Sequence, residues 1–467
     1  MLRLKDYLDF IQEKYPEEIL VIEDEVNPAT FDVTAILRNL EIVDKYPMVY
    51  FPRPLNLKGE VSRFPLITNV FASRERCALA MGFDPSQSKL PLSLEYAVRQ
   101  TRKLPTEEVS KEEAAVKEMV FVGDEADLSV LPIVRHHEMD LGPYIDMIPT
   151  MRDMDTGAYN ACFQRNMFKE SRKLGIHMSP RHNWEIARKH EALGRPTPVA
   201  IVAGHHPSFS LGALNVIPFD EDDYEVIGSV MGESLRVTPS ETWGKDFMVP
   251  ADAEIVIEGE VVPKVREIEA PFGEYTGYYG PQRYRHVIEV KAITHRKDAI
   301  FQNIFTGHRD TLILGAIPKE GDLYKRIRGM VPTVKSVCLP MSGCGRFNCY
   351  ISLDKKTDGE SKQAALIALG EIDFIKNVIV VDGDIDPFNE EEVMWSVATR
   401  VQADDDVDIL KNLKGSVLDP SLKGNILTAK IIIDATRPLA RPFADRLKVP
   451  EEALDRTRGI LERKNIL

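Results

Sequence analysis

The hydrophobic pattern of this chain changes its period along the sequence. From residue 1 to about 115, helical spacing alternates with short apolar runs, as in "LKDYLDFIQEKY" followed by "ILVIEDEV", which is typical of an α/β domain. Between about 116 and 315, apolar and polar residues alternate, most clearly in three segments: "AEIVIEGEVVP" (253–263), "HVIEVKAITHR" (286–296) and "AIFQNIFTG" (299–307). So many strands with so few helices between them predict a barrel or a sandwich.

Helical patterns return in the last third of the chain. "SKQAALIALGEI" (361–372) has helical spacing, "NVIVVDGDID" (377–386) is typical of a buried strand, and "PFNEEEVMWSVATRV" (387–401) begins another helix. A chain of 467 residues also exceeds the size at which one hydrophobic core stops growing. We therefore predict three domains: an α/β domain (1–115), a β domain (116–315) and a second α/β domain (316–467).

Composition argues against several classes of partner. With 59 basic and 73 acidic residues, the formal charge of −14 disfavours a nucleic acid or an anionic membrane surface, although a small anionic ligand stays possible. No apolar run approaches the roughly 18 residues that span a bilayer, and the start of the chain predicts an amphipathic helix rather than a secretory signal. The 5 scattered cysteines favour a reducing compartment, and "CLPMSGCGRFNC" has no recognisable zinc spacing. We expect a cytoplasmic protein with no membrane partner.

The stretch "EIEAPFGEYTGYYG" (267–280) places two carboxylates around a turn. In an unbroken strand, Glu269 and Glu274 would face opposite sides, but Pro271 and Gly273 break the alternation and let both side chains converge on one cavity. Three aromatic residues would give the turn a semi-apolar wall: Tyr275, Tyr278 and Tyr279. Such a wall disfavours the charged form of a carboxyl group, which favours a proton donor near neutral pH. The competing interpretation is a surface turn with solvated carboxylates.

Three further stretches carry polar residues that say little in isolation. "NACFQRNMF" (160–168) places Asn160 near Arg165, and a buried arginine needs a carboxylate partner, for which Glu269 is a candidate. His182 stands at a probable helix start, where a cap or surface role is the simpler interpretation, and Glu233 follows a glycine in "VIGSVMGESLRV".

Taken together, these stretches resemble the UbiD family of prenylated-FMN-dependent decarboxylases. The family pattern of an asparagine five residues before an arginine appears as Asn160 and Arg165, and its histidine and its G-E motif appear as His182 and Glu233. The most specific motif, E-x-P-F-G-E-x-x-G-Y, runs from Glu269 to Tyr278. Three later segments are also similar: "VIVVDGDIDPFNEEEVMWSVATR", "GSVLDPS" and "AKIIIDAT". The resemblance covers nearly the whole chain.

The resemblance implies a fold and a set of ligands. The expected fold is an N-terminal α/β domain, a central split β-barrel related to flavin reductases, and a C-terminal α/β domain that mediates dimerisation. Asn160, His182 and Glu233 would ligate Mn²⁺ or Mg²⁺, which bridges to the cofactor phosphate, and K⁺ would bind nearby. The implied cofactor-binding residues are Asn160, Cys162, Phe163, Arg165, Arg181, His182, Glu233 and Lys430.

The resemblance also implies a reaction: reversible, non-oxidative decarboxylation of an aromatic, heteroaromatic or α,β-unsaturated acid. Prenylated FMN would accept electron density as CO₂ leaves. Arg165 would orient the substrate carboxylate, Glu269 would hold the guanidinium, and Glu274 would deliver the proton that replaces CO₂. The implied partners are the acid and CO₂, a flavin prenyltransferase that supplies the cofactor, and a second copy in a homodimer or dimer-based oligomer.

Two positions depart from the family pattern. Gln164 stands where many relatives have tyrosine, and Arg181 stands where glutamine is common, which resembles relatives that act on hydroxylated aromatic acids. The alternatives are a split-barrel reductase that uses ordinary FMN and a non-catalytic subunit of a multi-component carboxylase, neither of which needs the set of Arg165, Glu269 and Glu274. Three residues near the expected pocket are weaker candidates for substrate contact than for ordinary structural roles: His295, His308 and Arg309.

Overall fold

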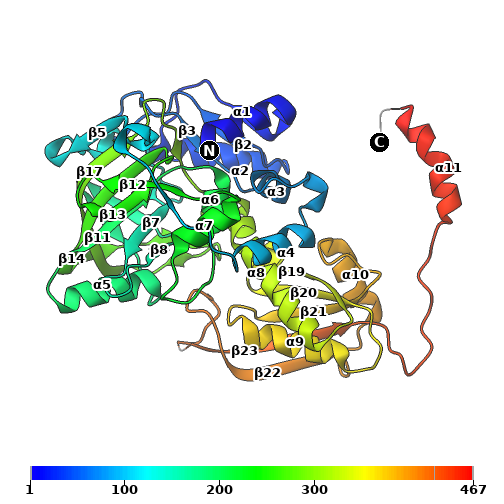
Figure 1. Ribbon diagram of the computed structural model, residues 1–467. Helices are drawn as coiled ribbons and strands as arrows, with labels where there is room; N and C mark the ends of the chain where they lie inside the picture. The colour runs from blue at the N-terminus through cyan, green and yellow to red at the C-terminus, as the bar shows by residue number, and fades with distance from the viewer. Residues whose placement is uncertain (1–2, 425, 465–467) are drawn as a thin grey trace.

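The structure of the chain is a computed structural model that describes residues 3–424 and 426–464. Its N-terminal part is a small α/β layer (Figure 1). The helices are α1 (Leu4–Lys14), α2 (Asp32–Ile42), α3 (Arg74–Ala80) and α4 (Leu90–Arg99). The sheet has the order β1 (Ile19–Val21), β2 (Met48–Phe51), β3 (Leu66–Thr68) and β18 (Phe301–Gln302), so its last strand comes from the middle of the chain.

A curved antiparallel sheet forms the centre of the molecule. Its strands follow the order β6 (Tyr144–Ile145), β9 (Asn166–Glu170), β10 (Lys173–Ile176), β17 (Arg283–His295), β14 (Ile255–Glu269), β11 (Thr197–Val202), β7 (Ile148–Arg152) and β8 (Tyr159–Ala161), with β5 (Met119–Val122) on β17. Among the described residues β6 and β8 do not pair, so the sheet is not a closed barrel and the split-barrel detail stays a prediction. Isoleucine and valine side chains such as Ile176, Ile201, Ile257 and Val290 fill its core.

Shorter elements cover the ends of this sheet. The helices are α5 (His182–Ala192), α6 (Pro207–Gly212) and α7 (Asp223–Met231). A small sheet joins β13 (Gly244–Pro250), β12 (Arg236–Ser240) and β4 (Glu107–Glu108), and a hairpin joins β15 (Phe272–Gly273) to β16 (Tyr279–Gly280).

The sequence predicts two of the three central strands well. The segments 253–263 and 286–296 lie within β14 and β17, and these strands pair along most of their length. The prediction of a strand over 299–307 is wrong for most of that segment: only Phe301–Gln302 is extended, and it pairs with β3 of the N-terminal sheet. The rest turns away from that sheet, and Thr306 donates a hydrogen bond to Asp146, which lies between β6 and β7.

The C-terminal part is a second α/β unit, and α8 (Arg309–Met330) leads into it. Its sheet has the order β19 (Val334–Cys338), β20 (Asn348–Leu353), β21 (Asn377–Asp382), β23 (Leu427–Ala435) and β22 (Val407–Lys414), with helices α9 (Glu360–Glu371) and α10 (Glu390–Arg400). These elements agree with the predicted helices and buried strand. The bounds of the three domains stay predictions, and α8 runs without interruption across residue 315.

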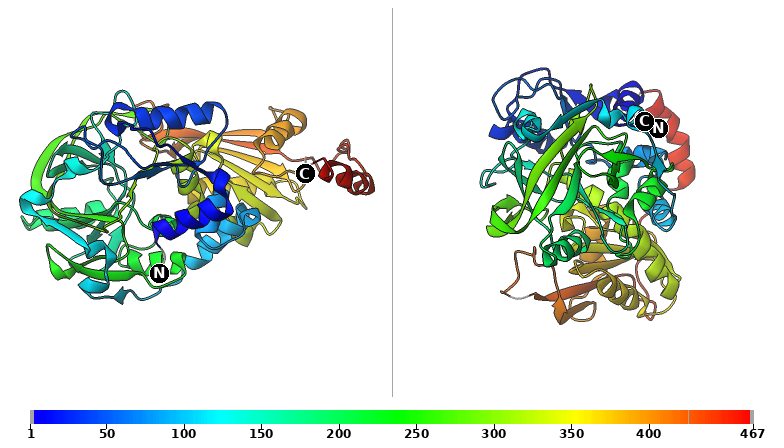
Figure 2. Two further views of the ribbon diagram at one scale, coloured as in Figure 1. Left: turned by 90° about the horizontal axis from the view of Figure 1, so that it is seen from above. Right: turned by 60° about the vertical axis from the view of Figure 1, so that its left-hand side comes forward.

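The last described helix, α11 (Glu451–Glu462), stands away from the rest of the molecule at the end of an extended segment (Figures 1 and 2). None of its residues is buried. Dimerisation through the C-terminal domain stays a prediction. In the described part of the chain, no helix is both long and apolar enough to cross a membrane.

Candidate active site

A cavity of about 680 Å³ lies between the central sheet and the C-terminal domain. The end of β8 and the loop that follows it (160–165) form one wall. The segments 177–183 and 213–217 form another. The β15–β16 hairpin and α8 contribute from the opposite side, and Arg346, Phe374 and Leu418 come from the C-terminal domain. The pocket therefore draws on segments that are far apart in the sequence.

Arg165 lies between the two predicted carboxylates. Its Nε and Nη2 donate hydrogen bonds of 2.8 and 3.0 Å to the two oxygens of Glu269, and its Nη1 forms an ion pair with Glu274. The side chain of Glu269 is fully buried, and those of Arg165 and Glu274 are 8% and 12% exposed. The structure thus brings together the three residues that the sequence predicts as the catalytic set.

The hairpin explains how two glutamates in one short segment reach the same guanidinium. Glu269 is the last residue of β14, and Glu274 follows β15, with its backbone N–H bonded to the carbonyl of Tyr278 at 2.9 Å. Gly273 lets this turn approach the body of the protein, because a Cβ at that position would collide with the ring of His137. Its N–H donates to Asp140 at 2.8 Å, which fixes the hairpin in place.

The environment of this set favours a charged arginine and a protonatable Glu274. Burial raises the pKa of Glu274, although the positive charge of Arg165 opposes that shift. Burial alone would lower the pKa of Arg165, but the charges and hydrogen bonds of Glu274 and Glu269 outweigh it and raise that pKa. A permanently charged guanidinium beside a carboxyl of raised pKa is a suitable arrangement for binding a carboxylate and transferring a proton.

Asn160 and His182 meet at another corner of the pocket. Asn160 Oδ1 lies 3.1 Å from His182 Nδ1. Two donor atoms on a six-coordinate ion with bonds of about 2.1 Å are separated by roughly 3.0 Å, so the spacing suits a shared divalent ion. Burial and the charge of Arg181 lower the pKa of His182, which favours the neutral imidazole that metal binding requires.

The carboxylate at this corner is Asp223, which the sequence interpretation missed. Asp223 lines the pocket, is buried, and accepts a hydrogen bond of 2.7 Å from the backbone N–H of Ala161, next to Asn160. The predicted ligand Glu233 is not among the lining residues, because it follows Gly232 at the far end of α7. Asp223 stands in the acidic run "DEDDYE". It differs from the other acidic residues of this run in being the first residue of α7.

The other predicted cofactor-binding residues divide into two groups. Cys162, Phe163 and Arg181 line the pocket, and burial raises the pKa of the Cys162 thiol to about 12, so it stays protonated. Lys430 is not among the lining residues; it lies on β23 and donates to the carbonyl of Asp373 at 3.1 Å. Its cofactor contact stays a prediction.

Three residues that the sequence offered only as weaker candidates for substrate contact have other neighbours. His295 packs between the rings of Phe64 and Phe121, His308 Nδ1 lies 3.0 Å from Glu41, and the guanidinium of Arg309 lies over Tyr46. None of these three is among the described residues that line the pocket. The aromatic wall is also smaller than predicted: Tyr275 lines the pocket, whereas Tyr278 and Tyr279 are exposed.

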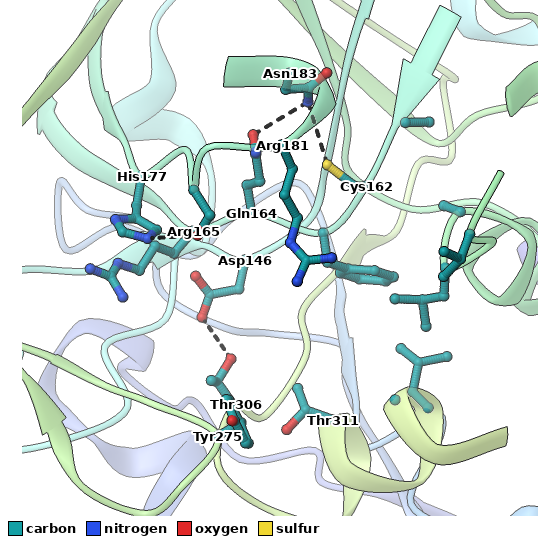
Figure 3. Close-up of a pocket in the computed structure, with 18 of the residues that line it drawn as sticks. Asp146, Cys162, Gln164, Arg165, His177, Arg181, Asn183, Tyr275, Thr306 and Thr311 are labelled. Carbon is teal, nitrogen blue, oxygen red and sulfur yellow. Dashed lines mark hydrogen bonds between the residues drawn. The ribbon is translucent and has the colours of Figure 1, made fainter. Parts of the chain in front are cut away.

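Asp146 is a further lining residue without a sequence signal. It is buried and accepts a hydrogen bond of 3.1 Å from Thr306 Oγ1 (Figure 3). Burial raises its pKa well above the usual range, with the charge of Asp140 adding to the shift. The pocket thus contains a second carboxyl group whose pKa is raised by burial.

Comparison with known proteins identifies this arrangement. Three family models match consecutive parts of the chain, described as the N-terminal domain (residues 12–89), the Rift-related domain (107–309) and the C-terminal domain (312–435) of 3-octaprenyl-4-hydroxybenzoate carboxy-lyase, UbiD. The chain belongs to the UbiD family. This confirms the resemblance seen in the sequence, and with it a carboxy-lyase with a three-domain UbiD fold.

UbiD-family relatives match over almost their whole length. Anhydromevalonate phosphate decarboxylase of Methanothermobacter thermautotrophicus is 34% identical, covering 94% of this chain and 97% of that protein. Phenolic acid decarboxylase of Sedimentibacter hydroxybenzoicus is 32% identical, covering 93% and 92%.

Two solved structures of a UbiD-class enzyme also match the fold of this chain. The UbiD-class enzyme HmfF from Pelotomaculum thermopropionicum, in complex with FMN, has a TM-score of 0.89 and 36% identity, covering 97% of this chain and 98% of that one. An evolved dimeric form of HmfF, in complex with prFMN, has a TM-score of 0.86 and 34% identity, covering 98% of each chain.

Proposed function

We propose that this UbiD-family protein is a prenylated-FMN-dependent enzyme that reversibly decarboxylates an aromatic, heteroaromatic or α,β-unsaturated acid. The observation that carries the proposal is the position of Arg165 between Glu269 and Glu274 on the wall of the pocket. The family membership and the flavin complexes of its structural relatives support the same reaction class.

Arg165 holds the carboxylate of the substrate. A guanidinium has five N–H donors. Glu269 accepts from Nε and Nη2, and Glu274 contacts Nη1, so one N–H on each terminal nitrogen remains for a substrate carboxylate. Glu269 keeps the guanidinium plane fixed, because it engages two of its nitrogens.

Glu274 supplies the proton that replaces CO₂. The bond between the substrate carbon and its carboxylate breaks, the carboxylate leaves as CO₂, and the proton of Glu274 passes to the carbon. Burial raises the pKa of Glu274, which favours the protonated form that this step needs. When bound, prenylated FMN supplies the electron sink for this carbon.

Asn160, His182 and Asp223 would hold a divalent ion that joins the cofactor phosphate to the protein. An amide oxygen, an imidazole nitrogen and a carboxylate suit Mn²⁺ or Mg²⁺. The 3.1 Å spacing of Asn160 and His182, and the hydrogen bond from the neighbouring Ala161 N–H to the pocket-lining Asp223, support this set in preference to one with Glu233. A bound K⁺, a homodimer and a flavin prenyltransferase as cofactor supplier belong to the same proposal.

One experiment separates this function from the two alternatives. The protein is coexpressed with a flavin prenyltransferase, the mass and absorbance of the bound flavin are recorded, and CO₂ release is measured with benzoic, furoic, pyrrole, indole and cinnamic acids and with phosphorylated enoic acids. We expect a prenylated flavin and CO₂ release from at least one acid. Unmodified FMN with rapid NADPH oxidation would favour the reductase, and bound flavin with no CO₂ release from any acid would favour the non-catalytic subunit.

A further inference from the structure

Two cationic side chains meet at a single glycine on the pocket wall. Gly315 lies inside α8, and Lys319, one turn further along, donates from Nζ to the Gly315 carbonyl at 2.6 Å. Arg346 reaches the same place from the C-terminal domain, so closely that a Cβ at Gly315 would collide with its Nη2. A glycine inside a helix costs about 1 kcal/mol relative to alanine, and here it makes room for the guanidinium. All three residues line the pocket.

Neither cation has a carboxylate partner among the described residues. Arg346 lies 4.3 Å over the ring of Tyr275, and its one hydrogen bond within the described part of the chain is to the Cys344 carbonyl, at 3.4 Å. Arg165, in contrast, contacts two carboxylates in the same pocket. Half-buried positive charges without a counter-ion are unfavourable, which indicates that an anion completes the site.

Two acidic residues adjacent in sequence to the pocket-lining residues Lys319 and Phe374 are already engaged. Glu320 lies on the other side of α8, where it pairs with Arg74 at 2.6 Å. Asp373 pairs with Lys414 at 2.7 Å. Burial and the charge of Arg346 lower the pKa of Lys319 to about 7, a shift that a bound anion would reverse.

The position of the pair relative to the reacting groups suggests which molecule brings the anion. Arg346 rests on Tyr275, and Tyr275 directly follows Glu274 in the hairpin. The cofactor phosphate has its own candidate ligands at Asn160 and His182, which belong to β8 and α5 rather than to the hairpin or α8. We propose that Lys319 and Arg346 bind a second anionic group of the substrate, a phosphate or a carboxylate, while Arg165 holds the carboxylate that leaves.

This inference rests on the proposed function and narrows its substrate class to acids with two anionic groups. An arginine with a lysine suits a phosphate, because the guanidinium supplies paired donors and the ammonium adds a second charge. The reaction itself is unchanged, since the second anion only anchors the substrate.

The test compares ligands that differ only in the second anion. Equilibrium binding of cinnamate, 4-phosphooxycinnamate and 4-carboxycinnamate to the flavin-loaded enzyme is measured by calorimetry for the native protein, Lys319→Met and Arg346→Gln. Arg326→Gln is the control, because Arg326 is an exposed cation of α8 that pairs with Glu371 at 3.2 Å. Flavin content and melting temperature are recorded for every variant.

We expect at least one of the doubly charged ligands to bind about tenfold or more tightly than cinnamate, as charge-assisted hydrogen bonds usually contribute. Lys319→Met and Arg346→Gln should abolish that preference and leave cinnamate binding and flavin content unchanged, and Arg326→Gln should retain the preference. No preference in the native protein, or a preference that survives both substitutions, would overturn the proposal. Loss of flavin in both variants would overturn it in favour of the cofactor phosphate.

The two proposals fail in different ways. If no acid releases CO₂ but the preference for a second anion is present and depends on Lys319 and Arg346, the anion site stands and the decarboxylase function is wrong. If CO₂ is released and the preference is absent, the decarboxylase function stands and the anion site is wrong.

Discussion

Arg165 and Glu269 are joined by two hydrogen bonds, 2.8 Å from Nε and 3.0 Å from Nη2, in a place where the glutamate is fully buried. The loop between β8 and β9, which carries Arg165, is therefore joined to the last residue of β14 through a single guanidinium. This coupling fixes the orientation of the group that we propose holds the substrate.

The first prediction concerns the stability of this pair. Glu269→Ala leaves Arg165 with one carboxylate in a site where the arginine side chain is 8% exposed. Breaking a buried ion pair by removing one partner costs about 3–5 kcal/mol, so the melting temperature should fall clearly. Glu269→Gln keeps an acceptor for one hydrogen bond and should lose less. A melting temperature that is unchanged in Glu269→Ala would contradict this account of the pair.

The second prediction concerns pH. A general acid acts in its protonated form, and burial raises the pKa of Glu274 above the ordinary value of 4.5 for a glutamate. The rate should therefore hold below the pKa in the folded enzyme and decline as the pH rises through it. In Glu274→Gln this declining limb should disappear from the residual activity, measured as CO₂ release across pH. A limb that persists unchanged in the variant would belong to another group.

The third prediction concerns the divalent ion. His182→Ala and Asp223→Asn should each weaken metal binding by roughly tenfold or more and release flavin with it, because ligand and charge are lost together. Glu233→Gln should keep both, since Glu233 does not line the pocket. Metal analysis and flavin absorbance check this. The opposite pattern, with metal retained in Asp223→Asn and lost in Glu233→Gln, would restore the original assignment.

The fourth prediction concerns the hairpin that carries Glu274. Gly273→Ala introduces a Cβ that collides with His137, so the hairpin must shift. A displacement of about 1 Å at a reacting group can cost about 10²-fold in rate, so CO₂ release should fall by one to two orders of magnitude. Gly370→Ala in α9 is the control, because a Cβ there meets nothing within 4 Å. Equal activity in the two variants would show that the hairpin tolerates the change.

The sequence alone predicts the reacting groups better than their surroundings. The turn at Pro271 and Gly273 predicts that Glu269 and Glu274 converge, and the structure places both on Arg165. That prediction succeeds because a short segment with rigid geometry determines it. Strands β14 and β17 are also predicted, because their alternating pattern extends over many residues.

Features that depend on distant parts of the chain could not be predicted. The segment 299–307 has a strand pattern, but only two of its residues pair with the partner strand β3. Most of the segment therefore forms no strand. In the sequence, Asp223 cannot be distinguished from its acidic neighbours. In the folded chain, the position of α7 places it against Ala161. Lys319 and Arg346 meet through the packing of α8 on the C-terminal domain, and no local pattern links them.

The most direct test of the central claim is the rate of CO₂ release by Glu274→Gln, loaded with prenylated flavin and supplied with an acid that the native enzyme decarboxylates. The substitution keeps the size of the side chain and removes its proton. The account predicts a rate about 10²- to 10⁴-fold below that of the native enzyme, with flavin content unchanged. CO₂ release at the native rate would contradict it.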